Sequence, residues 1–259
     1  MAFADGRLVP ADEATVPLLD AGLIRGDGCF EVARVRNGRP SFLDDHLERF
    51  ARSAAALGLP LDGVADAFAA LAVGFDGCVR VLITRGPPPR VFGVQEAVRV
   101  YPAALRLRSV SAPWLAAMGS TTLAGAKTLS YGPNMAARRA AQAEGADDAL
   151  LVNREGVVLE GPTAAFLWVE NAELMGPPLD LGILDSVSRK AIARLMPIRL
   201  CTANIERVQR ADEALMTSTT LDVKPVAALD GREWSPTPGP VTARLMDEFD
   251  ALVSRESSP

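Results

Sequence analysis

The alternation of apolar and polar residues predicts that the first part of the chain is rich in β-strands. Short alternating apolar runs flank the dipeptides DG at 5–6 and NG at 37–38, which are typical of tight hairpin turns. Further strands are predicted in the segments CVRVLITRG and RVFGVQEAVRVYP. Apolar residues at helical spacing predict two helices between these strands, one that begins at Asp44 and one over about 62–74.

The first of these helices contains the only histidine of the chain, His46, within the segment DDHLERF. Asp44 is the predicted N-cap and Gly58 the predicted stop. Without a partner motif for a catalytic histidine, His46 is interpreted as a polar residue of the first helical turn. The predicted apolar face of the helix consists of Leu47, Phe50, Ala51, Ala54 and Leu57.

The second part of the chain alternates between predicted strands and helices. Helices are predicted over about 133–144, 186–196 and 240–253, with strands in DALLVN, GVVLE, AAFLWV, ALMTS and KPVAAL. The segment SAPWLAAMGS between the two parts has neither the apolar spacing of a helix nor the alternation of a strand, and Pro113 interrupts strand pairing. We therefore expect an α+β chain with an N-terminal domain over 1–112, a linker over 113–119 and a C-terminal domain over 120–259.

Composition narrows the class of protein. The 259 residues include 49% hydrophobic residues, 27 Lys+Arg and 32 Asp+Glu, so a folded globular protein with a net charge of −5 is expected. Interspersed charges without a basic tract disfavour nucleic-acid binding. No apolar run approaches the ~20 residues that span a bilayer, and acidic residues stand where a signal peptide would be basic, so a cytoplasmic location is expected. Three scattered cysteines without C-x-x-C spacing favour neither a disulfide framework nor a metal site.

Two segments resemble nucleotide-binding motifs but fail in detail. GSTTLAGAKT over 119–128 has five residues between its glycines, and Ala126 stands where a P-loop requires glycine before the lysine. RGDGCFE lacks the third glycine of a dinucleotide-binding fingerprint and opens a predicted strand instead of a helix. Neither segment therefore predicts a nucleotide site.

Lysine chemistry has only three candidates, Lys127, Lys190 and Lys224. Lys127 follows small and apolar residues, and a partly desolvated lysine becomes a usable amine nucleophile or base. Lys190 has the setting of a solvated helix residue, and Lys224 precedes a proline. The residues alone leave both a catalytic and a structural or surface role of Lys127 open.

Six blocks of sequence, taken together in their order and spacing, resemble the class IV aminotransferase family of pyridoxal phosphate enzymes. That family includes branched-chain and D-amino-acid aminotransferases and 4-amino-4-deoxychorismate lyase. The resemblance implies a two-domain α+β fold of type IV with pyridoxal 5′-phosphate between the domains, and a homodimer. The blocks are RGDGCFEVARV, DDHLERF, AKTLSYGPNM, VVLEGPTAAFLWV, GILDSVSRKAI and ALMTSTTLDVKPV.

The same resemblance implies roles for individual residues. Lys127 matches the lysine that forms the Schiff base with the cofactor aldehyde, and Glu160 the glutamate that pairs with the pyridine nitrogen. Arg90 matches an arginine that reaches across the dimer to the substrate carboxylate, although Phe92 replaces the histidine usual two residues later. The other implied cofactor-binding residues are Arg49, Tyr131, Leu184, Val187, Ser188 and Thr219, and the other implied substrate-binding residues are Phe30 and Thr220.

Two reactions and one non-catalytic role follow from the resemblance. An aminotransferase would move an amino group between an amino acid, including a D-amino acid, and a 2-oxo acid by a ping-pong mechanism. The alternative enzyme is 4-amino-4-deoxychorismate lyase, which releases p-aminobenzoate and pyruvate. The third alternative is a non-catalytic protein that binds the cofactor or a partner. Retention of Lys127, Glu160 and Arg49 together favours an enzyme, and the segments around Phe30 and Arg90 favour the aminotransferase.

Overall fold

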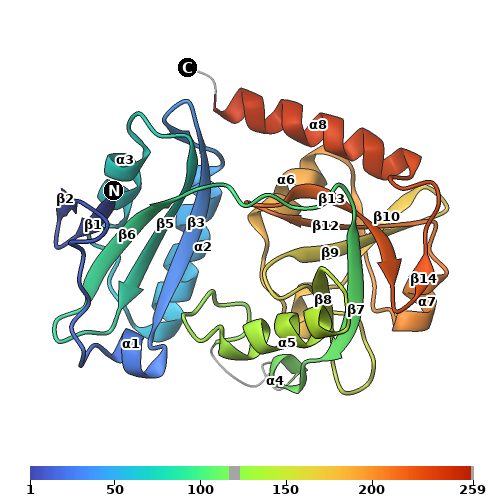
Figure 1. The fold of residues 1–259 in the computed structure, drawn as a ribbon, viewed down its shortest axis with the longest axis horizontal. Coiled ribbons are helices and arrows are strands. Elements are labelled where there is room, and N and C mark those ends of the chain that lie inside the picture. The colour runs from blue at the N-terminus through green and yellow to red at the C-terminus, as the bar shows by residue number, and fades with distance from the viewer. Residues whose placement is uncertain (117–122, 258–259) are drawn as a thin grey trace. The chain divides into compact units, whose positions relative to one another are not determined.

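A computed structural model describes residues 1–116 and 123–257, and the predicted α+β class is confirmed (Figure 1). The chain forms two compact units. Unit 1 contains residues 1–99, 125–131 and 252–259, and unit 2 contains residues 100–124 and 132–251. Of the predicted linker 113–119, Pro113–Ala116 forms the short helix α4, and residues 117–119 lie outside the described residues.

Unit 1 is built on a six-stranded sheet with the order β2-β1-β6-β5-β3-β4, in which all neighbouring strands are antiparallel. The predicted hairpin turns at 5–6 and 37–38 are confirmed, and all four turn residues have positive φ, as a type I′ turn requires. The strands are β1 (Ala2–Ala4), β2 (Arg7–Val9), β3 (Gly28–Arg36), β4 (Arg39–Pro40), β5 (Gly77–Thr84) and β6 (Arg90–Glu96).

Three helices belong to unit 1: α1 (Ala21–Arg25), α2 (Leu43–Leu57) and α3 (Val64–Ala72). The prediction of Asp44 as N-cap is wrong, because α2 begins at Leu43 with Phe42 as its N-cap. Asp44 instead lies in the first turn, where a negative charge suits the helix dipole. Gly58 is confirmed as the C-cap, with a φ of 62°. Helices α2 and α3 pack on one face of the sheet through Phe50, Ala54, Val64, Ala67, Phe68, Leu71, Val79, Val81 and Ile83.

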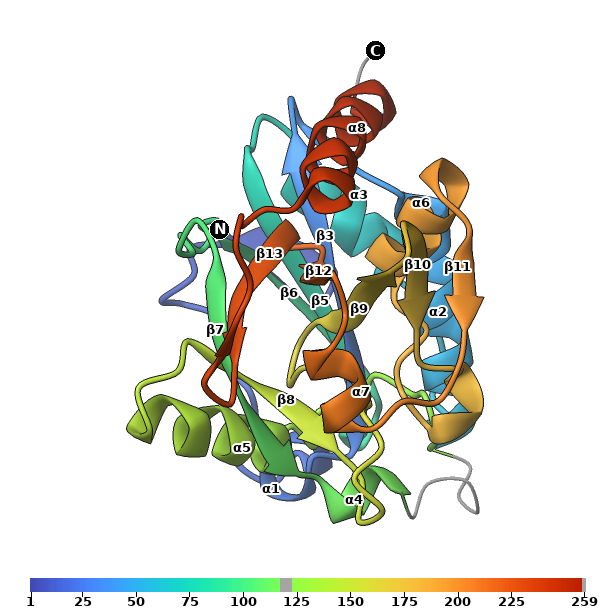
Figure 2. The ribbon, with the colours of Figure 1, turned by 90° about the vertical axis from the view of Figure 1, so that its right-hand side faces the viewer.

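Unit 2 is built on an eight-stranded sheet that combines parallel and antiparallel pairs. Its order is β11-β10-β9-β12-β13-β7-β8, with β14 paired to β13. Strands β10 and β11 are a parallel pair, and they lie side by side in Figure 2. The predicted strand GVVLE is wrong, because Val157 and Val158 make only isolated bridges. The strands are β7 (Leu105–Ser111), β8 (Asp148–Val152), β9 (Ala165–Glu170), β10 (Glu173–Gly176), β11 (Ile198–Leu200), β12 (Glu213–Ser218), β13 (Asp222–Leu229) and β14 (Arg232–Glu233).

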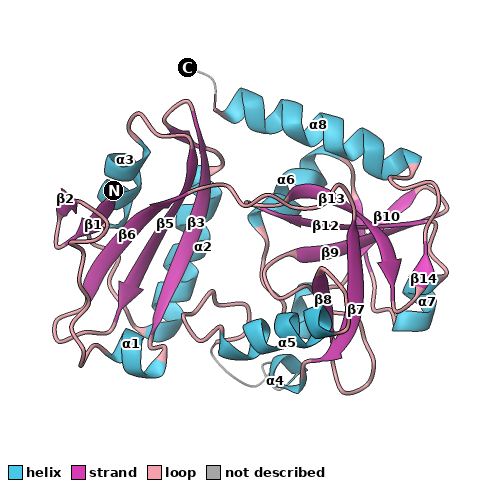
Figure 3. Cartoon of the chain, viewed as in Figure 1, coloured by secondary structure: helices cyan, strands magenta, loops and turns pink. Residues whose placement is uncertain are grey.

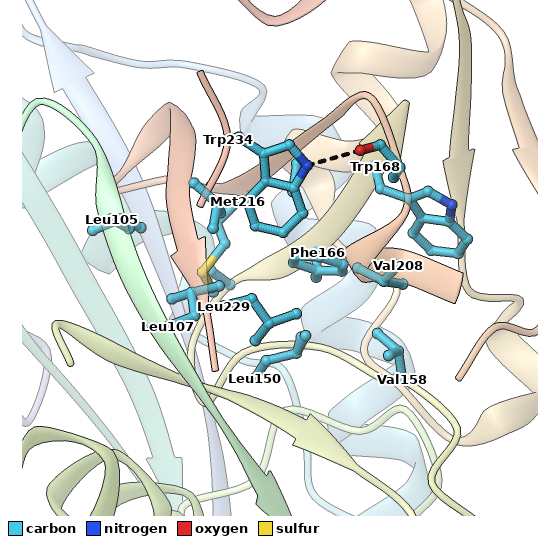
Figure 4. Packing of buried hydrophobic residues seen from close by; sticks show 14 of the residues in the cluster. Leu105, Leu107, Leu150, Val158, Phe166, Trp168, Val208, Met216, Leu229 and Trp234 are labelled. Atoms are coloured by element: carbon cyan, nitrogen blue, oxygen red, sulfur yellow. Dashed lines mark hydrogen bonds between the residues drawn. The ribbon is translucent and has the colours of Figure 1, made fainter. Parts of the chain in front are cut away.

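The three predicted helices of the second part are confirmed as α5 (Gly132–Ala143), α6 (Val187–Leu195) and α8 (Pro240–Glu256), and Figure 3 distinguishes them from the strands. Unit 2 also contains the short helices η2 (Leu179–Leu181) and α7 (Ile205–Gln209). The main core of unit 2 packs Phe166, Trp168, Met216 and Trp234 around the sheet, and the indole Nε1 of Trp234 donates to the carbonyl of Ala211 at 2.8 Å (Figure 4). No helix of the described residues has the length and apolar character needed to cross a bilayer.

Candidate active site

The segment that carries Lys127 is held against the beginning of β3 in unit 1. The backbone N–H of Phe30 donates to the carbonyl of Lys127 at 3.0 Å, and the N–H of Leu129 donates to the carbonyl of Gly28 at 2.8 Å. Cys29 and Thr128 form the antiparallel bridge between these two bonds. Lys127 therefore has the fixed backbone of a strand residue, although it lies far from β3 in sequence.

The two glycines of RGDG permit this close approach. A Cβ atom on Gly28 would lie 2.4 Å from the carbonyl oxygen of Ile83 and 2.6 Å from a side-chain carbon of Leu129. Gly26 has a φ of 69°, and a Cβ there would lie 2.5 Å from the hydroxyl oxygen of Ser130. These glycines thus leave room for the segment that carries Lys127. This close packing explains the two glycines of RGDG, and no bound nucleotide is needed to explain them.

The amine of Lys127 lies against two aromatic rings. Its Nζ is 3.2 Å from the hydroxyl of Tyr131 and 4.4 Å from the ring centroid of Phe30. The rings of Phe30 and Tyr131 meet edge to face, with centroids 5.2 Å apart. Only 9% of Lys127 is exposed. The structure therefore brings together three of the predicted site residues around a largely desolvated amine.

Arg49, a further predicted site residue, belongs to a buried ionic cluster between α2 and β3. Its Nε and Nη2 donate to the two carboxylate oxygens of Glu31 at 2.6 and 2.8 Å. The Nδ1 of His46 lies 2.9 Å from the same carboxylate. The exposed fractions of Glu31, His46 and Arg49 are 0%, 1% and 5%. The interpretation of His46 as an ordinary polar residue of a helical turn thus misses a buried hydrogen bond.

The cluster shifts the titration of its members. Burial by itself would raise the pKa of Glu31, but the charge and hydrogen bonds of Arg49, with the hydrogen bond of His46, hold that pKa well below its usual range. Burial lowers the pKa of His46, and the charges of Arg49 and Lys127 lower it further. The hydrogen bond and the charge of Glu31 act in the opposite direction. Burial, assisted by the charge of Glu31, raises the pKa of Cys29 to about 12, which disfavours the thiolate form.

Ser53 joins this cluster to the lysine segment. Its hydroxyl donates to the carbonyl of Arg49 at 3.0 Å and accepts the backbone N–H of Lys127 at 3.0 Å. Helix α2 thereby fixes the position of Lys127 through a buried side chain. No motif in the sequence indicates Glu31 or Ser53. The only signal for Ser53 is its spacing of four residues from Arg49, which puts both on one helix face.

In unit 2, Glu160 and Leu184 are brought together. The backbone N–H of Leu184 lies 3.3 Å from each carboxylate oxygen of Glu160. Glu160 is 9% exposed, and its charge acts on the buried guanidinium of Arg189. Burial lowers the pKa of Arg189, while the charges of Asp185 and Glu160 oppose that shift.

The N-terminus of α6 presents the predicted residues Val187 and Ser188. Ser186 is the N-cap, and its hydroxyl accepts the N–H of Arg189. The N–H groups of Val187 and Ser188 fall in the first turn, where a helix supplies no internal partner. Both residues are buried, and so is the Nη1 atom of Arg189, which has no hydrogen-bond partner in the described part of the chain. This helix end can therefore receive an anion.

The predicted residues Thr219 and Thr220 follow β12 and are half-buried. The hydroxyl of Thr220 lies 3.3 Å from that of Tyr101 and 3.5 Å from that of Ser218. Thr217, the penultimate residue of the same strand, is fully buried, and its Oγ1 has no partner among residues 1–116 and 123–257. A buried hydroxyl without a partner is rare and marks a place for a ligand atom.

Arg90 has different contacts from the other predicted site residues of unit 1. Its guanidinium makes a two-pronged ion pair with Asp5 and lies 5.4 Å from the ring centroid of Phe92. It lines a cavity of about 850 Å³ together with Asp20 and Pro89. Arg90 thus contacts the turn between β1 and β2 and strand β6, and within the described residues it shares no contact with the aromatic rings beside Lys127.

Comparison with known proteins gives one family. The family model described as Amino-transferase class IV matches residues 28–229. The chain is 27% identical to D-alanine aminotransferase of Bacillus licheniformis, over 98% of this chain and 97% of that protein. It is 30% identical to the bifunctional aminodeoxychorismate lyase / D-amino acid transaminase of Mycobacterium tuberculosis, over 92% of this chain and 95% of that protein.

Solved structures agree with these relatives. A hypothetical aminotransferase from Mycobacterium tuberculosis in its PLP-bound form superposes with a TM-score of 0.89 at 26% identity. The match covers 99% of each chain. The similarity thus extends over both units and is not limited to the blocks around the candidate site.

Proposed function

Because the chain belongs to the class IV aminotransferase family, we propose that it is an aminotransferase that moves an amino group between an amino acid and a 2-oxo acid. The observation that carries the proposal is the buried amine of Lys127, held by strand pairing beside Phe30 and Tyr131. D-amino acids are the proposed donors, because the chain is similar over nearly its whole length to a D-alanine aminotransferase.

The family is one of pyridoxal phosphate enzymes, and the residues of each unit fit this cofactor. Unit 1 supplies a desolvated amine for the aldehyde. Unit 2 supplies buried first-turn amides on α6 and the partnerless hydroxyl of Thr217, which suit a phosphate. When bound, pyridoxal phosphate supplies a ring that accepts the electron pair left when the substrate Cα–H bond breaks.

Each predicted cofactor-binding residue is assigned a task on this basis. Lys127 would hold the cofactor through its aldehyde, and with the substrate bound its amine would take the proton from Cα and return a proton as general acid. Tyr131 orients that amine through its hydroxyl. Glu160 would hold a proton on the ring nitrogen, and Leu184 would lie against the ring. The phosphate ligands are assigned to Arg49, Val187, Ser188 and Thr219.

Aminodeoxychorismate lyase is the second candidate function. It is favoured by the bifunctional relative, which is similar over 92% of this chain. Both reactions begin with removal of the same proton by the same lysine, so the residues assigned above serve either one. The discriminating experiment assays D- and L-amino acids with pyruvate or 2-oxoglutarate, beside aminodeoxychorismate with detection of p-aminobenzoate. Release of p-aminobenzoate without amino transfer would replace the first proposal by the second.

Glu160→Gln is expected to retain the cofactor and to lose about 10²-fold or more of its turnover. A neutral amide cannot keep the ring nitrogen protonated, whereas binding of the cofactor also depends on other residues. Cofactor content measured by absorbance and turnover measured on the same sample test this prediction. The matched control is Glu155→Gln, which changes an exposed carboxylate of a nearby turn and should leave both unchanged. Turnover of Glu160→Gln equal to that of the control would remove Glu160 from this role.

A homodimer is part of the proposal. Five apolar side chains are exposed in the segment before β3, and Leu18 and Leu19 are the most exposed of them at 79% and 81%. A surface of this kind usually binds another protein, and a second copy of this chain is the partner that the family resemblance implies. The five residues are Val16, Leu18, Leu19, Leu23 and Ile24.

Complementation tests the role of Arg90 across such a dimer. If Arg90 binds the substrate carboxylate in the partner's site, mixing inactive Lys127→Ala with inactive Arg90→Ala should restore up to about a quarter of the parent activity. One site of each mixed dimer would then hold both intact groups. Subunit exchange is verified with two affinity tags. Proven exchange without recovery would place the action of Arg90 within its own subunit.

The proposed location is the cytoplasm. All three cysteines, Cys29, Cys78 and Cys201, are free, which suits a reducing compartment.

A further inference from the structure

Arg80, which no sequence motif indicated, shares an aromatic ring with Lys127. The guanidinium carbon of Arg80 lies 5.0 Å from the ring centroid of Phe30, and the Nζ of Lys127 lies 4.4 Å from the same centroid. Arg80 on β5 pairs with Val32 on β3, two positions from Phe30. Paired residues and residues two apart share a sheet face, so Arg80 and Phe30 project from the same side.

Glu96 orients the guanidinium without using all of its donors. The Nε and Nη2 of Arg80 donate to the two carboxylate oxygens of Glu96 at 2.6 and 3.0 Å. The Nη1 group of Arg80 makes no hydrogen bond within the described ranges 1–116 and 123–257. The side chain of Arg80 is 32% exposed, so a small anion can reach it. A planar guanidinium held along one edge offers its remaining N–H groups to a second carboxylate.

The surroundings of Arg80 favour an anionic ligand. Arg34 lies on the same face of β3, two positions beyond Val32, and its Nε is buried without a partner in the part of the chain that the structure describes. Three cationic side chains, those of Arg34, Arg80 and Lys127, thus share this face of unit 1 with the carboxylate of Glu96.

We propose that Arg80 is a specificity-determining residue that binds the distal carboxylate of a dicarboxylic substrate such as glutamate or 2-oxoglutarate. The inference rests on the proposed function, because that function requires the reacting carbon of the substrate to lie beside the amine of Lys127. The α-carboxylate is assigned above to Arg90 of the partner subunit, so Arg80, beside the Phe30 ring, is assigned the carboxylate at the far end of the substrate. Arg80 would therefore favour dicarboxylic over monocarboxylic substrates.

Kinetics of Arg80→Gln with two amino acceptors test the proposal. The KM for 2-oxoglutarate should rise about 10- to 100-fold, because one charge-assisted contact is lost. The KM for pyruvate, which has no distal carboxylate, should change by less than about threefold. Arg80→Lys should recover part of the preference, since it restores the charge without the planar fork. Equal changes for both acceptors, or no change for either, would overturn the proposal.

A binding measurement separates this proposal from the proposed function. Calorimetry of the cofactor-loaded enzyme should show tighter binding of glutarate than of butyrate, and Arg80→Gln should abolish the difference. If the parent enzyme turns over none of the tested substrates, the proposed function fails, while the glutarate measurement still decides the role of Arg80. Unchanged glutarate binding in Arg80→Gln would contradict that role.

Two further variants exclude a purely structural explanation. If Arg80 served only to pair with Glu96, Glu96→Gln and Arg80→Gln would change the KM for 2-oxoglutarate alike. We expect Glu96→Gln to keep the preference for 2-oxoglutarate, because an amide oxygen can still accept from the guanidinium. Arg199→Gln breaks an exposed ion pair with Glu173 and should leave both KM values unchanged.

Discussion

Replacing Lys127 by alanine is expected to lower turnover by at least about 10³-fold, because one amine serves both as the covalent anchor and as the acid and base. Lys127→Arg should be equally inactive, since a guanidinium retains the positive charge but does not form the covalent bond. Steady-state turnover with the best donor and acceptor pair measures the loss. Lys190→Ala, which removes a lysine of α6 paired with Asp185 at 3.6 Å, should stay active.

The covalent attachment has its own measurement. Borohydride reduction of the parent enzyme should fix the cofactor to a single peptide, the one that contains Lys127, and mass spectrometry identifies that peptide. Cofactor fixed instead on Lys190 or Lys224 would contradict the assignment. A protein that takes up no cofactor during reconstitution would contradict it as well.

Replacing Glu31 by glutamine is expected to destabilise the cofactor-free protein by about 3–5 kcal/mol, because it leaves the guanidinium of Arg49 buried without its counter-charge. Denaturant unfolding followed by circular dichroism measures the change. The matched control is Glu48→Gln, which breaks the exposed pair of Glu48 with Arg52 on the same helix and should cost less than about 1 kcal/mol. Equal unfolding midpoints for the two variants would show that the buried cluster does not stabilise the fold.

The contribution of Glu31 should also depend on pH in one direction. Its pKa is lower in the folded protein than the ordinary value of 4.5, so its stabilising contribution is fully present above that pH. The contribution is lost as the pH falls through the lowered folded pKa. The stability difference between the parent and Glu31→Gln should therefore be constant from neutral pH to about pH 5 and shrink in stronger acid. A difference that grows on acidification would contradict the direction of the shift.

Local signals in the sequence predict most of the secondary structure. The hairpin turn at 37–38 follows from the backbone preferences of asparagine and glycine, and the end of α2 at Gly58 from the left-handed conformation that glycine adopts. The N-cap at Phe42 escapes such reasoning, because tertiary packing and not a side-chain hydrogen bond sets that helix start. The segment GVVLE has the composition of a strand, but pairs only at isolated positions.

Some residues of the candidate site can likewise be predicted from the sequence, and others cannot. Lys127 and Glu160 are found because the family blocks contain them, whereas composition alone leaves Lys127 ambiguous. Nothing in the local sequence marks Glu31 and Arg80 as site residues, because a charged residue in a strand ordinarily indicates a position that faces solvent. Their partners, Arg49 and Phe30, are supplied by chain segments that only the folded structure brings together.

The pairing of residues 127–129 with the beginning of β3 has a consequence for synthesis on the ribosome. The nascent chain emerges from its N-terminus, so strands β1 to β6 can form their sheet while this stretch of the β3 edge still lacks its neighbour. An open strand edge is a template for adding another chain. That edge stays uncovered until residues 127–129 have left the ribosome and paired with it. During synthesis, this stretch of β3 is therefore open to pairing with other nascent chains until the segment that carries Lys127 covers it.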